Sequence, residues 1–270
     1  MLIIHKMYKK ISSTQNVLVK QIIKLQDKAR ERKKTQQFVF EGLRELKLAI
    51  DSGYTIDKLL FFSDLITASS LEDITKPQTE LIEIDKNVYQ KIAYRNTTEG
   101  IIAIANSKMH TLSELILSKN PLILVVESPE KPGNMGAILR TADAANVDAI
   151  IIANPKTDLY NPNSIRSSVG CVFTNQIGIG STKEVINFLK SKKINIYTAA
   201  LKDKASVYTE IDYTKPTVIV VGTEATGLSE DWFINTNKNI IIPMKGKIDS
   251  MNVSVATGVL VFEAVRQRND

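Results

Sequence analysis

Three loops in the second half of the chain, at residues 127–140, 222–227 and 243–252, carry most of the side chains that could do chemistry. Two of them pair glycines with a charged residue, and glycine leaves the backbone bare where a ligand must come close. An arginine in such a place can grip a phosphate or a carboxylate, because its planar guanidinium stays charged. The candidate polar residues of the three loops are Asn134, Arg140, Glu224, Ser250 and Asn252.

Each of these residues also has a purely structural explanation. Arg140 can pair with Asp143 one helical turn away, and Glu224 can be a solvated loop residue. Asn134 and the polar residues of 250–252 can cap the helices that follow them, because their side-chain oxygens accept bonds from free backbone N–H groups. Spacing alone leaves these alternatives open.

Each loop follows a short, wholly apolar run, at Leu122–Val126, Val218–Val221 and Ile240–Ile242. Runs of this length bounded by turn residues are typical of parallel strands buried on both faces. Open parallel sheets bind ligands outside the carboxyl ends of their strands. We therefore expect the three loops to meet in space.

Strands and helices alternate from residue 122 onward, which predicts an α/β fold with a parallel sheet covered by helices on both faces. The predicted strands are Leu122–Val126, Ala149–Ile152, Gln176–Ile179, Ile194–Thr198, Thr217–Val221 and Asn239–Ile242. The predicted helices are Met135–Ala145, Ser164–Val169, Thr182–Ser191, Ser229–Ile234 and a last one from Asn252. The last segment is rich in β-branched residues that also suit a strand, but its length favours a helix.

The first half predicts a smaller α/β unit. It begins with a helix over Gln15–Lys34 that has one basic face. The strands expected after it are Phe38–Phe40, Lys58–Phe62, Leu81–Ile84 and Gly100–Ala105, and the helices are Glu41–Asp51 and Lys86–Ala93. We expect a first domain at residues 1–107, a linker at 108–120 and a second domain at 121–270.

Composition excludes several classes of protein. The 270 residues are 43% hydrophobic, which is ample for a core, and they include one cysteine and two histidines. A disulfide framework, a zinc site and a Ser-His-Asp triad are therefore not expected. No apolar run approaches the roughly 18 residues of a membrane span, and no signal peptide is recognised. We expect a soluble, cytoplasmic protein without a metal ion.

The positive charge is concentrated near the N-terminus. The chain carries a net charge of +6, whereas residues 6–34 alone carry +8, so the remainder is −2. A basic arm on a near-neutral body suggests a polyanionic partner, most simply nucleic acid. A solvated lysine-rich helix is an equally good explanation of the charge alone. The candidate residues for binding nucleic acid are Lys20, Lys24, Lys28, Arg30, Arg32, Lys33, Lys34 and Arg140.

Taken together and in order, the three loops resemble the motifs of a known family. The patterns N-x-G-x-x-x-R, G-x-E-x-x-G-L and I-P-M-x-G followed by S-x-N-V-S-V-A resemble those of the SpoU (TrmH-type) RNA ribose 2′-O-methyltransferases of the SPOUT class. The resemblance covers about residues 121–268. Residues 11–107 are similar to the RNA-binding domain often attached in this family, which resembles ribosomal protein L30e.

The resemblance implies a fold and an activity that spacing did not show. The fold is an α/β sheet with a C-terminal trefoil knot, preceded by a small L30e-like α/β domain, in a homodimer. The activity is methyl transfer from S-adenosylmethionine to a ribose 2′-hydroxyl of RNA, with ribosomal RNA as the favoured substrate. The alternatives are a transfer RNA substrate and a non-catalytic RNA-binding protein. An oxidoreductase is disfavoured because the dinucleotide fingerprint GxGxxG is absent.

The resemblance also assigns roles to individual residues. Arg140 matches an arginine thought to activate the ribose hydroxyl, either as a base or, as we prefer, by stabilising the alkoxide. The other residues assigned to catalysis are Asn134, Glu224, Ser250 and Asn252. The residues assigned to the cofactor are Thr198, Ala199, Leu201, Gly222, Thr223, Glu224, Gly227, Ile242, Met244, Ser250, Met251 and Val253. Met251 stands where leucine is commoner, a change that nearly conserves volume.

Overall fold

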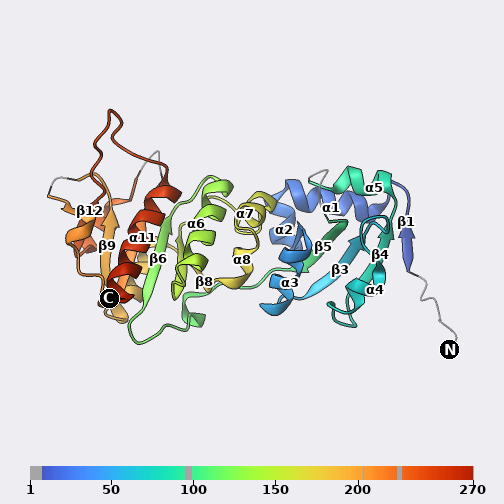
Figure 1. Ribbon diagram of the computed structural model, residues 1–270, viewed down its shortest axis with the longest axis horizontal. Coiled ribbons are helices and arrows are strands. Elements are labelled where there is room, and N and C mark those ends of the chain that lie inside the picture. The colour runs from blue at the N-terminus through green and yellow to red at the C-terminus, as the bar shows by residue number, and fades with distance from the viewer. Residues whose placement is uncertain (1–7, 95–98, 203, 224–226, 270) are drawn as a thin grey trace. The chain divides into compact units, whose positions relative to one another are not determined.

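The computed structural model describes residues 8–94, 99–202, 204–223 and 227–269 (Figure 1). The chain divides into two compact units. The first contains the residues up to Lys108 together with Tyr160–Arg166, and the second contains Met109–Leu159 and the residues from Ser167 onward. Residues 109–120, which we expected to be linker, therefore lie with the second unit.

The first unit is built on a five-stranded sheet with the order β1-β4-β3-β5-β2. Strands β1, β4 and β3 are parallel to one another, and β5 is antiparallel to both of its neighbours. The strands are β1 (Lys9–Ile11), β2 (Gln37–Glu41), β3 (Ile56–Phe61), β4 (Glu80–Ile84) and β5 (Ile101–Asn106). The helices are α1 (Val17–Asp27), α2 (Ala29–Thr35), α3 (Leu43–Asp51), α4 (Ala68–Glu72) and α5 (Lys86–Ile92).

The single basic helix predicted over Gln15–Lys34 is wrong, because the chain breaks between α1 and α2. Lys28 is extended there, with φ −119° and ψ 107°. The apolar residues of α1 face the sheet, and Leu18, Val19, Ile22 and Leu25 are buried in the core of the unit. Burial of this stripe leaves the lysines of α1 on the outer side.

The second unit contains a seven-stranded sheet, all parallel, with the order β10-β12-β9-β11-β6-β7-β8. Its strands are β6 (Leu122–Glu127), β7 (Ala149–Ala153), β8 (Ile177–Gly180), β9 (Asn195–Ala199), β10 (Ser206–Val207), β11 (Thr217–Val221) and β12 (Lys238–Ile241). Its helices are α6 (Pro132–Ala144), α8 (Cys171–Thr174), α9 (Thr182–Ser191), α10 (Glu230–Asn235), α11 (Val253–Asn269) and the short turns η1 (Leu112–Glu114) and η2 (Tyr208–Glu210). Helix α7 (Pro162–Ser167) lies where the chain passes from the first unit to the second.

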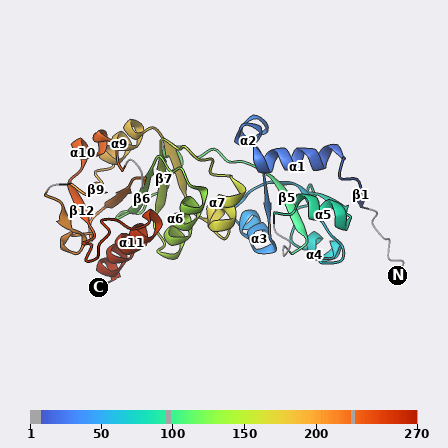
Figure 2. The ribbon, with the colours of Figure 1, turned by 90° about the horizontal axis from the view of Figure 1, so that it is seen from above.

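Helices cover both faces of the second sheet, as the alternating pattern predicted. Figure 2 shows α9 and α10 on one face and α6 and α11 on the other. Val185 and Leu189 of α9 and Trp232 of α10 are buried against the strands, of which β6, β7 and β11 are almost wholly apolar. A strand covered on both sides has no solvent face, so its sequence does not alternate.

The strand register brings the three loops to one edge of this sheet. Val221, the last residue of β11, lies beside Val126 of β6 and Ala199 of β9, and Ala199 lies beside Ile240 of β12. The four carboxyl ends are therefore level, and the loops that follow them converge.

Candidate active site

A cavity of about 460 Å³ lies at this converging edge. Its size falls within the range of about 300–1,000 Å³ that is usual for small-molecule sites. The predicted cofactor residues that line it are Ala199, Leu201, Gly222, Thr223, Gly227, Ile242, Met244, Ser250, Met251 and Val253. Glu224 lies outside the described residues.

Thr198 was also predicted to contact the cofactor, and here the structure differs. Its side chain is fully buried and does not line the cavity. Its hydroxyl donates to Asn239 Oδ1 at 2.6 Å and lies 3.1 Å from the hydroxyl of Thr236. Side chains of successive strand residues point to opposite faces, so Thr198 holds β9 to β12 while Ala199 faces the cavity.

Glycine is required at both ends of the loop that follows β11. A Cβ on Gly222 would lie 2.4 Å from the carbonyl carbon and oxygen of Gly227. Gly227 has φ +66° and donates its N–H to the carbonyl of Thr223 at 3.0 Å. The loop thus closes on itself, and the bare backbone at Gly222 forms part of the cavity wall.

Three charged residues line the same cavity and were missed from the sequence: Lys202, Glu230 and Asp249. Lys202 Nζ lies 4.3 Å above the ring of Phe233, which holds the ammonium over the cavity wall. Lys202 and Glu230 fall outside the three motifs, and Asp249 occupies a position within the third loop that the motif does not specify, so motif spacing gave no signal for them. They place charges of both signs around a largely apolar interior.

A second, smaller cavity of about 60 Å³ adjoins the first. The two share Gly222, Thr223 and Val253 as lining residues, and Asn134 lines the smaller one. Helix α6 begins at Pro132, so Asn134 lies in its first turn and is not the cap that we expected. Its Oδ1 accepts a hydrogen bond from Asn252 Nδ2 at 3.2 Å, across 118 positions of sequence.

Asn252 has a structural role as well as this contact. Its Oδ1 accepts from the N–H of Ser254 at 3.0 Å and from the Ser254 hydroxyl at 2.6 Å, so it caps α11. Ser250 does not cap this helix, since its hydroxyl donates to Asp249 Oδ1 at 3.2 Å. Capping therefore accounts for some of the hydrogen bonds of Asn252 and for none of those of Ser250, which lines the larger cavity.

Arg140 lies on α6, outside both cavities. Its side chain is exposed, and among the described residues it has no ion pair or hydrogen bond. The expected surface pair with Asp143 is not formed, because Asp143 accepts from the hydroxyl of Thr174. The structure thus brings Asn134 and Asn252 together, places Ser250 beside them in the adjoining cavity, and leaves the Arg140 guanidinium open to solvent.

Glu127 is a buried charged residue that sequence reasoning overlooked. It ends β6 and is 3% exposed. Its carboxylate accepts three hydrogen bonds, from the Thr182 hydroxyl at 2.6 Å and from the N–H and hydroxyl of Ser229, both at 2.7 Å. A carboxylate is seldom buried without such partners. The bonds tie the starts of α9 and α10 to β6, and Ser229 directly follows the cavity loop.

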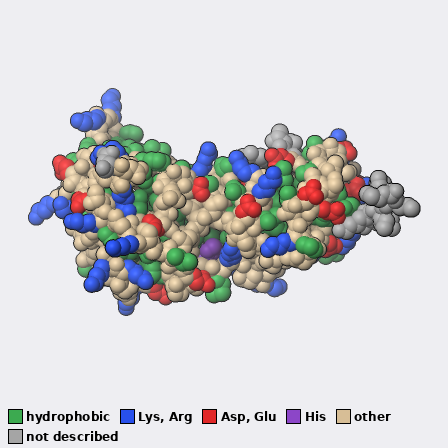
Figure 3. Space-filling model, turned by 60° about the horizontal axis from the view of Figure 1, so that its bottom comes forward, with side chains coloured by type: hydrophobic (Ala, Val, Ile, Leu, Met, Phe, Trp, Pro, Cys, Tyr) green, Lys and Arg blue, Asp and Glu red, His purple; other side chains and the backbone are tan. Residues whose placement is uncertain are grey.

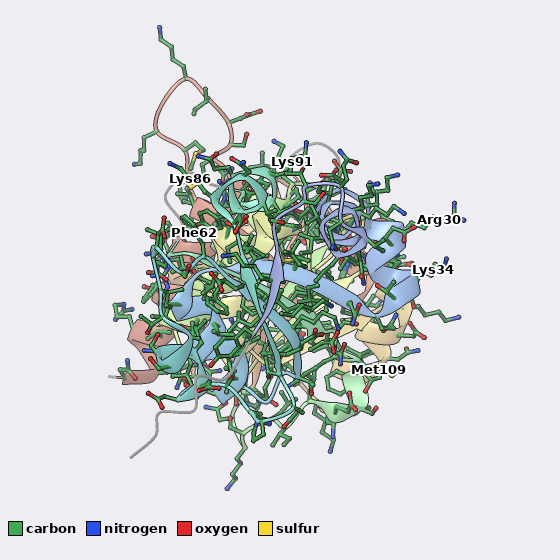
Figure 4. The ribbon with its side chains drawn as sticks, turned by 90° about the vertical axis from the view of Figure 1, so that its right-hand side faces the viewer. Arg30, Lys34, Phe62, Lys86, Lys91 and Met109 are labelled. Carbon is green, nitrogen blue, oxygen red and sulfur yellow. The ribbon has the colours of Figure 1, made fainter. Side chains whose placement is uncertain are left out.

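The basic residues predicted to bind RNA separate into two groups. Lys20, Lys24, Lys28, Arg30, Lys33 and Lys34 are exposed on α1 and α2 or between them, and Figure 4 shows Arg30 and Lys34 pointing away from the protein. The assignment of Arg32 is wrong, because this residue is 5% exposed. Its guanidinium donates to the backbone carbonyls of Leu25 and Gln26, which fixes α2 against the end of α1.

On the face drawn in Figure 3, Lys and Arg side chains project around the second unit. No group of three or more His, Cys, Asp or Glu residues that could hold a metal ion occurs in the described part of the chain. Within the same residues, no helix is both long and apolar enough to cross a membrane.

Comparisons with known proteins agree with this geometry. A model of the SpoU rRNA methylase family matches residues 121–262, and a model of the MRM3-like substrate binding domain matches residues 16–103. The 23S rRNA (guanosine(2553)-2'-O)-methyltransferase of Bacillus subtilis is 29% identical over 254 residues, which are 94% of this chain and 98% of that protein. The tRNA (guanosine(18)-2'-O)-methyltransferase of Thermus thermophilus is 34% identical over 174 residues, which are 60% of this chain and 84% of that protein. The AdoMet-bound rRNA methyltransferase of Sinorhizobium meliloti has a TM-score of 0.88 and 27% identity, covering 96% of this chain and 98% of that one.

Proposed function

The chain belongs to the SpoU rRNA methylase family, and we propose that it methylates a ribose 2′-hydroxyl of 23S ribosomal RNA in the cytoplasm. The sequence-based assignment to an S-adenosylmethionine-dependent RNA 2′-O-methyltransferase is confirmed by the family match and the relatives. The trefoil knot stays a prediction. The length of the alignment favours ribosomal RNA over transfer RNA as the substrate. The ribosomal RNA enzyme of B. subtilis aligns with 94% of the chain, whereas the transfer RNA enzyme of T. thermophilus aligns with 60%.

The larger cavity fits S-adenosylmethionine in size and in lining. Leu228, Ile242 and Leu260 offer apolar surface for an adenine ring, while the bare backbone at Gly222 and Gly227 offers close hydrogen bonds. Glu230 and Asp249 can accept from the cofactor's ammonium or ribose hydroxyls, and Lys202 can pair with its carboxylate. When bound, the cofactor would supply an electrophilic methyl group carried on a sulfonium.

The acceptor ribose fits beside this cavity, at the small cavity lined by Asn134. The hydrogen bond between Asn134 and Asn252 joins α6 to α11 there, so both amides are held in place to orient a hydroxyl. In-line transfer forms a C–O bond and breaks a C–S bond, and the hydroxyl proton passes to solvent. We assign the Arg140 guanidinium to stabilise the developing alkoxide and a neighbouring RNA phosphate.

We also propose that the enzyme is a homodimer in which α11 faces a second copy. Val255 is 55% exposed and Phe262 is 48% exposed, and the two lie on one side of α11, two turns apart. A helix normally buries its apolar stripe. Pairing with the same helix of another chain would bury this one, and the test is the molecular mass in solution of Phe262→Glu against the wild type.

Methyl transfer from labelled S-adenosylmethionine to unmodified 23S ribosomal and transfer RNA transcripts tests the proposal. The expected result is one position of 23S RNA that resists alkaline cleavage. Arg140→Ala should lose at least about 100-fold in rate, in the range found when one oxyanion donor is removed, whereas Lys183→Ala, at an exposed position of α9, should not change the rate. If only transfer RNA is modified, the substrate is transfer RNA rather than 23S ribosomal RNA. Absence of both methyl transfer and cofactor binding would refute the proposal.

A further inference from the structure

The first unit contains a cavity of about 470 Å³ that shares no lining residue with the two cavities of the second unit. It lies where β2 passes into α3, and its lining is partly apolar and partly charged. The apolar lining is formed by Val39, Phe40, Pro162 and Ile165, and the polar lining by Gln26, Glu41, Arg44, Glu45, Tyr94, Glu99 and Arg166. All of these residues belong to the first unit, including those of α7.

One carboxylate is built into the wall of this cavity. Glu45 is 9% exposed, and its Oε1 pairs with Arg44 at 3.0 Å. A Cβ on Gly42 would lie 2.2 Å from Glu45 Oε2, and Gly42 has φ +103°, so only glycine permits this arrangement. Among the described residues Oε2 has no hydrogen-bond partner. A carboxylate oxygen in this position can accept a hydrogen bond from a ligand.

An aromatic ring and two guanidinium groups stand around the same cavity. Tyr94 is 51% exposed, and the guanidinium carbon of Arg166 lies 5.1 Å from the centre of its ring. The side chain of Arg44 is 61% exposed. Exposed aromatic rings and arginine planes are the surfaces on which unpaired RNA bases stack. Arg44 pairs with Glu45, and Arg166 donates to Asn163 Oδ1 at 2.7 Å. A guanidinium has five N–H donors, so both arginines keep donors for the phosphates that accompany a base.

We propose that this cavity binds an unpaired guanine base of the substrate RNA, an inference that rests on the proposed RNA methyltransferase activity. Guanine presents two adjacent N–H donors, N1–H and N2–H, and a carboxylate with two oxygens accepts such a pair. Adenine, cytosine and uracil do not present two ring-edge donors side by side. Glu45 accepts from the guanine edge, Tyr94 stacks on its face, and Arg44 and Arg166 hold the adjoining phosphates.

The lining carries charges of both signs, from the carboxylates of Glu41, Glu45 and Glu99 and the guanidiniums of Arg44 and Arg166. Glu41 accepts from the Tyr94 N–H and Glu99 accepts from the Leu43 N–H, so the backbone engages these two carboxylates. Gln26 lines the cavity from α1, and the neighbouring Lys24 and Lys28 are exposed. These exposed lysines attract a polyanion to the unit, and Glu45 selects one base within it.

The test uses the full-length protein with the cofactor cavity saturated by S-adenosylhomocysteine, and measures binding of guanosine and inosine 5′-monophosphate by calorimetry. Inosine lacks the 2-amino group and so one of the two donors. Guanosine monophosphate should bind about tenfold more tightly than inosine monophosphate, the lower range for one good base contact. Glu45→Gln should abolish this preference, and Tyr94→Leu should weaken both nucleotides. Asp51→Asn, an exposed change on the same helix, is the matched control.

The outcomes separate this proposal from the proposed function. Equal binding of the two nucleotides, or a preference that survives in Glu45→Gln, would overturn the guanine site even if methyl transfer is intact. Binding of an arginine-rich peptide in place of guanosine monophosphate would assign the cavity to a protein. Failure of methyl transfer on every RNA would refute the proposed function, while the nucleotide titration would still decide the chemistry of the cavity.

Discussion

Replacing Glu127 by glutamine should loosen the wall of the larger cavity, which Glu127 does not line, although it lines the smaller one. The Glu127 carboxylate holds Thr182 and Ser229, and Ser229 follows the loop whose glycines form the cavity wall. Glutamine keeps the shape and one carbonyl oxygen, which the two hydroxyls can still share. Its amide N–H₂ group then faces the Ser229 backbone N–H, so one donor opposes another.

The magnitude follows from the bond that is lost. Hydrogen bonds to charged groups contribute about 1.5–3 kcal/mol. Unfolding of a domain of this size shifts by about 2–4 °C per kcal/mol, so the melting temperature should fall by about 3–12 °C. If part of this loss of free energy also weakens ligand binding, the dissociation constant of S-adenosylhomocysteine should rise by up to about tenfold.

Calorimetric unfolding and titration with S-adenosylhomocysteine measure the two effects on one sample. Glu210→Gln makes the same chemical change at an exposed position of the same unit and should alter neither value. A Glu127→Gln protein that melts and binds like the wild type would refute the argument that the buried carboxylate positions the loop. A loss of stability with unchanged affinity would restrict its role to the fold.

Three further changes test other parts of the structure. Replacing Lys33 and Lys34 by glutamine should make the dependence of RNA affinity on salt shallower by about 1.4–1.8 logarithmic units per decade, and an unchanged slope would place the RNA elsewhere. Arg32→Ala should instead lower the free energy of unfolding by about 1.5–3 kcal/mol, measured with denaturant, because the carbonyls that it binds lose a charged donor. Hydrogen bonds from the N–H and hydroxyl of Ser181 hold the pKa of Glu184 below its usual 4.5. The stabilisation by these hydrogen bonds is complete above pH 4.5 and is lost as the pH falls through the lowered pKa. The difference in melting temperature between the wild type and Glu184→Gln should therefore shrink between pH 6 and pH 3. A difference that stays constant over this range would contradict the argument.

The second sheet and its ligand edge could be predicted because they rest on local patterns. Apolar runs without alternation indicate strands buried on both faces, and parallel strands place their carboxyl ends together. Helix α11 is helical despite its β-branched residues, since a segment of 17 residues covering one face of a sheet is stabilised by packing. Most of the residues assigned to the cofactor line the larger cavity for the same reason.

Other features depended on partners far away in the chain. Strand β1 has only three residues and exists because it pairs with β4 about seventy positions later. The local sequence does not distinguish Arg32 from the exposed basic residues around it, and only the turn from α1 to α2 buries its side chain. The sequence by itself determined which segments are strands and which loops end them. Tertiary structure alone decided that Asn134 meets Asn252 and that Glu127 holds Ser229, because the contact of two residues a hundred or more positions apart depends on strand order and helix packing, which no local pattern encodes.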